Sequence, residues 1–219
     1  MRAVKSCCEG LEKQFDAKWA ARELRRFRRR GPTRSTRLLV EAIAREDPKG
    51  ATLLDIGGGV GAVQHLLIES GVRHAIDVDI SRPYVEAARD EAERRGTIGR
   101  MRFLVADFLD VAETLEAADI VTLDRVICCY PEVEPLVRAS AAHADRWLGL
   151  VYPRSSAPFR AAAAAANLIM FLRRSRFRAH VHDTSSVDSL IRSLGFEVRS
   201  VVRTLAWQVF LYEAVDQQV

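Results

Sequence analysis

The chain contains 219 residues, of which 48% are hydrophobic and 28% are charged, and its formal net charge at pH 7 is +4. These values fit one globular domain with an additional segment, and they exclude a disordered chain, a collagen and a disulfide-stabilised miniprotein. The apolar uncharged stretch 161–172 has 12 residues, whereas a membrane-spanning helix needs about 20.

Strands and helices alternate along most of the chain. Helices are predicted over residues 11–30, 34–45, 63–70, 83–95, 136–144, 161–172 and 186–194. Strands are predicted over residues 51–56, 74–80, 101–105, 119–123, 147–152, 196–203 and 207–213. The last two strands are joined by too few residues for a parallel crossover. The pattern therefore predicts an α/β fold: a doubly wound, mostly parallel seven-stranded sheet with an antiparallel C-terminal edge hairpin and an N-terminal helical arm.

The arm is strongly basic. Residues 1–37 hold 12 Lys/Arg against four Asp/Glu, whereas the remainder holds 21 against 25. The arginines of residues 22–30 could bind phosphate groups. The sequence favours a solvated helix face instead, on a helix whose inward-pointing residues are Trp19, Leu24 and Phe27.

The cysteines form two adjacent pairs, Cys7–Cys8 and Cys128–Cys129. Neighbouring cysteines rarely form a relaxed disulfide, and neither pair has the C-x-x-C spacing of a zinc or redox site. The five histidines are scattered, and the first residues lack the apolar core of a signal peptide. We expect a reduced, cytoplasmic protein without a metal site.

The sharpest motif is the glycine-rich turn that follows the first strand, residues 53–61, Leu-Leu-Asp-Ile-Gly-Gly-Gly-Val-Gly. Glycines at alternate positions let the backbone turn tightly and approach a ligand closely. Asp79 follows Gly61 by 18 residues and ends the next strand, where a carboxylate can accept both hydroxyls of a ribose. The motif predicts a nucleoside-containing ligand.

Asp55 helps to choose that ligand. Gly57, Gly59 and Ala62 also fit the G-x-G-x-x-A form of a nicotinamide-binding turn. A carboxylate at position 55 would repel an anionic pyrophosphate, however, and would attract an ammonium or a sulfonium. S-adenosylmethionine carries both of these cations.

In order and spacing, four motifs resemble those of the class I S-adenosylmethionine-dependent methyltransferases. They are residues 53–61, 77–81 (Asp-Val-Asp-Ile-Ser), 106–108 (Ala-Asp-Phe) and 119–127. The likeness covers about residues 50–213. It implies a Rossmann-like methyltransferase domain over 46–219, with a basic helical arm or lid over 1–45 and a variable cap over about 153–183.

The resemblance also implies cofactor contacts. The residues concerned are Asp55, Gly57, Gly59, Gly61, Asp79, Ile80, Asp107, Phe108 and Asp124. Asp55 would lie near the methionine ammonium, Asp79 at the ribose and Asp107 at the adenine amino group. The alternatives are that Asp107 caps a helix, that Asp124 pairs with Arg125, and that the two apolar residues belong to the core.

The segment after Asp124 should face the methyl acceptor, because ligands bind outside the carboxyl ends of the strands in such sheets. Residues 125–131 lack the Asn/Asp-Pro-Pro-aromatic run that is common in methyltransferases of base amines. Tyr130 would line the acceptor pocket or pack before the proline that follows it. The cysteine pair here is expected to act as two small buried hydrophobic residues.

Within the expected cap, the apolar stretch 161–172 precedes four arginines in residues 173–178. An apolar wall with a cationic rim would suit a hydrophobic acceptor with a carboxylate or phosphate; the alternative is a solvated surface helix. His182 would be a general base for an acceptor hydroxyl or would simply precede the next helix. The candidate catalytic residues are thus Asp124, Tyr130 and His182.

A local likeness of residues 119–130 and 151–154 to magnesium-protoporphyrin O-methyltransferases adds a propionate carboxylate to the candidate acceptors. We therefore expect an S-adenosylmethionine-dependent methyltransferase that acts on a small molecule, at oxygen or nitrogen, by in-line transfer. An RNA or protein methyltransferase anchored by the basic arm, and a cofactor-binding module without turnover, are the alternatives. Asp55 disfavours a nicotinamide-dependent dehydrogenase. A homodimer is left open.

Overall fold

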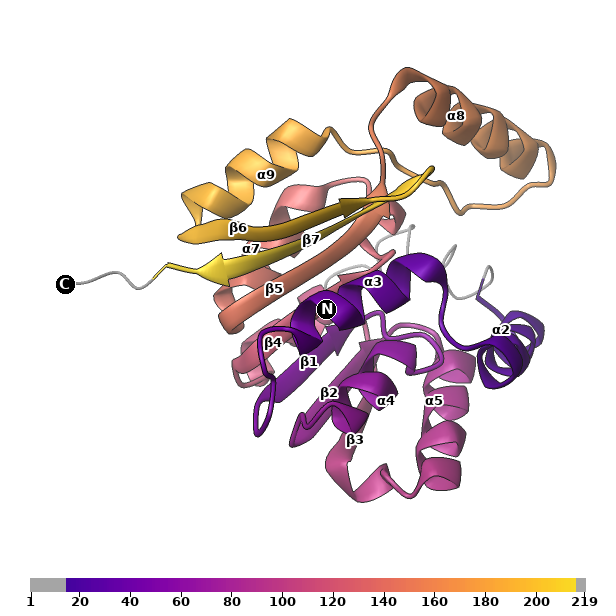
Figure 1. The fold of residues 1–219 in the computed structure, drawn as a ribbon. Coiled ribbons are helices and arrows are strands. Elements are labelled where there is room, and N and C mark those ends of the chain that lie inside the picture. Colours follow the sequence, from indigo (N-terminus) through magenta and orange to yellow (C-terminus); the bar gives the residue numbers. More distant parts are fainter. Residues whose placement is uncertain (1–14, 216–219) are drawn as a thin grey trace.

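A computed structural model describes residues 15–215. Its strands form one sheet in the order β3-β2-β1-β4-β5-β7-β6 (Figure 1). The strands are β1 (Thr52–Ile56), β2 (His74–Asp79), β3 (Met101–Val105), β4 (Ala118–Asp124), β5 (Ala144–Pro153), β6 (Phe196–Arg203) and β7 (Trp207–Ala214). Strands β1 to β5 run parallel to one another, and β7 lies antiparallel to both β5 and β6. The predicted sheet and its edge hairpin are confirmed.

The helices are α2 (Ala17–Arg30), α3 (Arg34–Ala44), α4 (Ala62–Glu69), α5 (Arg82–Arg95), α6 (Phe108–Val111), α7 (Val133–Ala142), α8 (Ala157–Leu172) and α9 (Thr184–Ser193). The predicted helices are present, but α2 begins at Ala17, after its N-cap Asp16, and not at residue 11, and the short helix α6 was not predicted. Helices α7 and α8 begin three and four residues earlier than the predicted starts, 136 and 161. Each has a proline in its first turn, where the missing N–H has no partner to lose.

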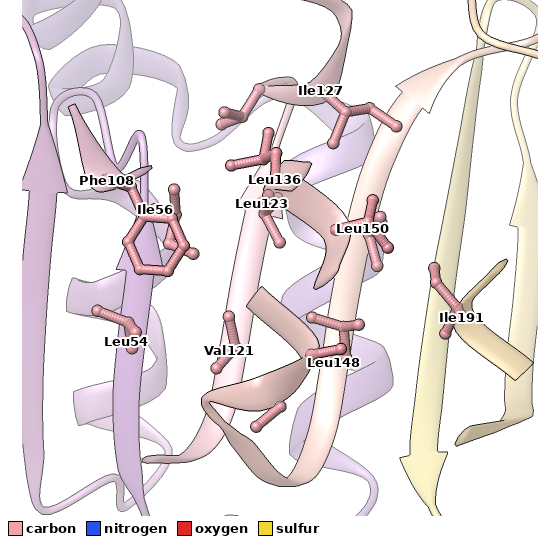
Figure 2. Close-up of a cluster of buried hydrophobic side chains, with 14 of the residues drawn as sticks. Leu54, Ile56, Phe108, Val121, Leu123, Ile127, Leu136, Leu148, Leu150 and Ile191 are labelled. Atoms are coloured by element: carbon pink, nitrogen blue, oxygen red, sulfur yellow. The ribbon is translucent and has the colours of Figure 1, made fainter. Parts of the chain in front are cut away.

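Both faces of the sheet are buried. Leu53 and Leu54 follow each other on β1 and therefore point to opposite faces. Leu54 belongs to the apolar cluster that α6, α7 and α9 cover (Figure 2). Leu53 belongs to the cluster that α3 and α4 cover on the other face. This double burial explains why the central strands read as continuous apolar runs.

Helix α2 packs on α5. Leu24 and Phe27 of α2 are buried against Tyr84, as the sequence predicted for the two α2 residues. The prediction that Trp19 points inward is wrong: its side chain is 48% exposed, and the Arg22 guanidinium lies 5.7 Å from its ring. The contact stripe of α2 has the three-to-four-residue spacing of a helix face, and Trp19 falls outside it.

Among the described residues, none of the helices combines the length and hydropathy that crossing a bilayer requires. The same part of the chain holds no cluster of three or more His, Cys, Asp or Glu side chains that could bind a metal ion. Cys128 and Cys129 are free thiols. Cys7 and Cys8 lie outside the described residues.

Candidate functional site

The carboxyl ends of β1, β2 and β4 border a cavity of about 290 Å³, called the main cavity below. Several residues that the sequence singled out line it: Gly57, Gly59, Asp79, Ile80, Phe108, Asp124 and Tyr130. Others that it singled out lie outside the lining: Asp55, Gly61, Asp107 and His182. The strands thus bring most of the expected residues to the main cavity, while the others do not line it.

The glycine loop is shaped as its sequence requires. Gly57, Gly59 and Gly61 have φ angles of 68°, 60° and 77°, in the left-handed region that side chains disfavour. A Cβ on Gly57 would lie 2.5 Å from a methyl carbon of Val126. Gly61 does not touch the main cavity; it stands at the N-cap of α4. The loop leaves a cradle in which a ligand can approach bare backbone, which fits the expected cofactor.

Asp79 is the carboxylate of the main cavity that the loop itself holds in place. Its Oδ2 accepts a hydrogen bond from the Gly59 backbone N–H at 3.0 Å, and its Oδ1 accepts one from Ser81 at 2.8 Å. Burial raises the pKa of Asp79 from its ordinary value of 3.8 to about 6, although these two bonds lower it. At pH 7 the group is an ionised, fixed acceptor, as ribose hydroxyls require.

Asp55, which the resemblance places near the methionine ammonium, does not line the main cavity. It is fully buried behind the loop, where Thr122 Oγ1 donates to it at 2.6 Å and Gln64 Nε2 at 3.1 Å. Burial raises the pKa of Asp55 to about 7. A carboxylate with both oxygens engaged below the loop acts on a ligand through its field and by supporting the loop, and direct contact with an ammonium is not what this geometry offers.

The expected adenine side contains a link that the sequence did not reveal. Asp107 is the N-cap of α6 and accepts from the Leu109 N–H at 3.1 Å, so the capping alternative is confirmed. Tyr130 Oη also donates to Asp107, at 2.8 Å. Phe108 is 2% exposed and still borders the cavity, so it serves both core and lining. The bond to Asp107 thereby fixes the phenol of Tyr130 at the main cavity.

Asp124 ends β4 inside the main cavity. It accepts from Thr36 Oγ1 of α3 at 2.5 Å, and the Arg125 guanidinium lies 3.4 Å from its other oxygen. The ion pair that the sequence left as an alternative is therefore present. Arg125 has a φ of 65°, a left-handed conformation that is unusual for a side chain of this size.

Glu23 of α2 is a cavity residue that sequence reasoning missed. It accepts from Tyr84 Oη at 2.8 Å and lies 3.4 Å from Arg125 Nη2. Phe15, just before α2, lines the same cavity. The described part of the arm therefore contributes two residues to the wall of the main cavity. The available signal was that Glu23 is the one acidic residue among the arginines of Ala17–Arg30.

A second cavity of about 860 Å³ lies beside the first and is called the arginine-lined cavity below. Its lining includes apolar residues and three arginines: Phe171, Leu172, Phe177, Arg174, Arg176 and Arg178. Cys129 borders both cavities, and the Phe15 and Phe177 rings meet edge to face with centroids 5.9 Å apart. The cap predicted from the sequence therefore adjoins the main cavity.

His182 supports the loop between β4 and α7. Its Nε2 lies 2.9 Å from the Ile127 carbonyl and 3.0 Å from the Tyr130 carbonyl. A nitrogen that faces two carbonyl oxygens carries the proton and donates it, so this atom is not a free base. The general-base role predicted for His182 is not supported by this position, whereas its role in holding Tyr130 is.

Comparisons with known proteins agree with this geometry. Residues 53–148 match a family model described as a methyltransferase domain. A ribosomal protein L11 methyltransferase of Edwardsiella ictaluri is 30% identical over 103 residues, which are 47% of this chain and 34% of that protein. The chain thus spans about a third of the length of the curated relatives it matches.

Two solved structures share the fold over nearly the whole chain. Magnesium protoporphyrin IX methyltransferase from Synechocystis PCC 6803 superposes with a TM-score of 0.73 at 19% identity, covering 95% of this chain and 99% of that one. An O-methyltransferase family protein from Burkholderia thailandensis has a TM-score of 0.73 at 18% identity, covering 94% and 63%. The glycine loop and Asp79 are thus part of a region, residues 53–148, that is similar to a methyltransferase domain, and the solved structures share the fold of nearly the whole chain.

Proposed function

We propose that the protein transfers a methyl group from S-adenosylmethionine to a small, hydrophobic acceptor that carries an anionic group, at oxygen or nitrogen. The observation that carries this proposal is the junction of the two cavities at Cys129. One cavity has the glycine loop and a buried ribose-type carboxylate. The other has aromatic walls and arginines, which suit an apolar body with a carboxylate or phosphate.

The residues of the main cavity fit the cofactor. Gly57 and Gly59 would lie under its methionine part, Asp79 would accept from the ribose hydroxyls, and Ile80 with Phe108 would pack against the adenine. When bound, S-adenosylmethionine supplies an electrophilic methyl group on a sulfonium. The chain's contribution is then alignment and exclusion of water, which can lower a barrier by roughly 7–11 kcal/mol.

The acceptor side would be organised by Asp124, Tyr130 and the arginines. A carboxylate acceptor is already ionised at pH 7 and needs no base, whereas a hydroxyl or an amine would. Asp124 lines the main cavity with its charge balanced by Arg125, and Tyr130 is oriented through Asp107. The arm 1–45 would act as a lid over the cofactor, and residues of about 153–183 would act as the acceptor cap.

A second candidate is methylation of a protein or an RNA. It is favoured by the curated relatives, which are ribosomal protein L11 methyltransferases, and by the exposed arginines of α2, which include Arg25, Arg29 and Arg30. Those relatives match over only 103 residues, however. A macromolecular acceptor held by the basic arm would be recognised by a steep loss of RNA affinity as salt rises.

The test combines calorimetry with labelled methyl transfer. The full chain should bind S-adenosylmethionine with a dissociation constant of about 1–100 μM and should not bind NADH. Labelled methyl groups should then appear on a hydrophobic carboxylate, phenol or amine from a metabolite panel. Transfer to RNA or protein alone would support the second candidate, binding without any transfer would indicate a cofactor-binding module, and NADH binding would refute the assignment.

Variants of the arginine-lined cavity sharpen this test. Replacing Arg174 and Arg176 together with Gln should raise KM for an anionic acceptor by about 100-fold or more, because two charged hydrogen bonds of roughly 1.5–3 kcal/mol each are lost. The affinity for S-adenosylmethionine should hardly change. Arg138→Gln, at an exposed site on α7, is the matched control. An unchanged KM in the double variant would place the acceptor elsewhere.

A further inference from the structure

Helix α8 has an apolar outer face. Its half-buried positions recur with the spacing of a single stripe that faces the protein: Phe159, Ala163, Ala166 and Met170. On its other side, side chains that are 52–72% exposed are Leu168, Ile169, Phe171 and Leu172. The outer face of a surface helix ordinarily carries charges, yet Arg160 is the one charged residue of Ala157–Leu172.

This exposure is a fixed feature of the cap. Asn167 exchanges two hydrogen bonds of 2.8 Å with the backbone of Ala179, which fastens the returning segment along α8. The His180 N–H donates to the Cys128 carbonyl at 2.7 Å and ties that segment to the loop beside the main cavity. Figure 1 shows α8 standing apart from the helices that cover the sheet. The apolar side chains are therefore presented outward by a braced helix.

The segment that carries this face is itself cationic. Residues 157–182 contain five arginines and no Asp or Glu. Arg173, Arg174 and Arg176 follow the apolar residues directly and are exposed. A second copy of the chain would bring the same cationic segment against itself in a two-fold interface, which like charges oppose. A negatively charged surface with an apolar interior matches both properties.

We propose that the α8 tip, defined as residues 168–176, docks on the surface of an anionic lipid bilayer. Its apolar side chains would enter the headgroup region, and its arginines would meet the lipid phosphates. The arginine-lined cavity is bordered by Phe171 and Leu172. Docking therefore brings that cavity next to the lipid. The proposal does not depend on methyl transfer, since binding to vesicles needs neither cofactor nor acceptor.

The experiment is sedimentation of the full chain with vesicles of phosphatidylcholine alone or with about a third phosphatidylglycerol. Binding should be at least tenfold tighter to the anionic vesicles and should weaken as salt rises. Leu168→Ala with Ile169→Ala should weaken it about tenfold or more, because each removes apolar area that enters the bilayer. Arg173→Gln should weaken it roughly fivefold. Val201→Ala, on the exposed side of β6, is the control and should change nothing.

A spectroscopic readout tests the insertion directly. In Leu168→Trp, fluorescence in excess of the parent's should shift to the blue with anionic vesicles and be quenched by brominated lipids. Equal melting temperatures of parent and variants would confirm that the fold is kept. The proposal is overturned if the parent stays in the supernatant with anionic vesicles. It is also overturned if the Leu168/Ile169 variant binds as tightly as the parent, or if its main effect is to dissolve a dimer or a complex with an acidic protein.

Discussion

Replacing Asp79 with Asn should separate cofactor affinity from stability. In the proposed site the carboxylate accepts from two ribose hydroxyls, and charge-assisted bonds contribute roughly 1.5–3 kcal/mol each. Asn keeps one acceptor oxygen and brings an amide N–H₂ against the Gly59 or Ser81 N–H that now donates to the carboxylate. The dissociation constant for S-adenosylmethionine should therefore rise about 30–1,000-fold.

The same substitution should not lower the stability of the ligand-free protein. Burial raises the pKa of Asp79 from 3.8 to about 6, so keeping the ionised form folded at pH 7 costs about 3 kcal/mol. The Asn side chain is uncharged, so the variant avoids that cost. It loses one hydrogen bond, which contributes about 1 kcal/mol. Calorimetric titration and thermal unfolding at pH 7 measure both quantities. An unchanged affinity for S-adenosylmethionine would refute the reasoning. A loss of unfolding free energy as large as the loss of binding free energy would also refute it.

Four further outcomes are expected. The affinity of the parent for S-adenosylmethionine should fall up to tenfold for each pH unit below about 6, because Asp79 gains a proton there. Calorimetric titration from pH 5 to 8 checks this. Gly57→Ala should cost about 2–3 kcal/mol of unfolding free energy, because its Cβ would lie 2.5 Å from a methyl group at a φ of 68°. Gly96→Ala, with a φ of 70° and open space, should cost only about 1 kcal/mol; equal losses would contradict the argument. Asp55→Asn should gain stability relative to the parent as pH rises from 4 to 7, by up to about 4 kcal/mol in denaturant unfolding, because burial raises the pKa of Asp55 to about 7; a difference that does not vary with pH would disprove this cause. Glu91→Gln should lower the unfolding free energy by about 2–3 kcal/mol, since its fully buried carboxylate pairs with three arginines of α2 and α5, and a loss below 0.5 kcal/mol would show that those pairs are solvated.

The sequence by itself determined the order of the strands and helices and the glycine loop and strand-end carboxylate of the expected cofactor site. Alternating apolar runs, caps and turn residues act locally, so the strands and helices could be predicted to within a few residues. The glycine loop and Asp79 are recognisable for the same reason, because a left-handed turn and a carboxylate at a strand end are requirements of the local backbone. The parallel sheet then brings these strand ends to one edge wherever the rest of the chain lies.

Tertiary structure alone decided which side chains meet. Glu23 lies 61 residues from Tyr84 and 102 from Arg125, and no local pattern encodes those contacts. His182 became a donor to two carbonyls because the cap returns to the β4–α7 loop, and Asp55 became a buried support because Thr122 lies beside it on the neighbouring strand. Periodicity specifies which face of an element is apolar, but the partner of a polar side chain depends on distances that exist only after the sheet has closed its core.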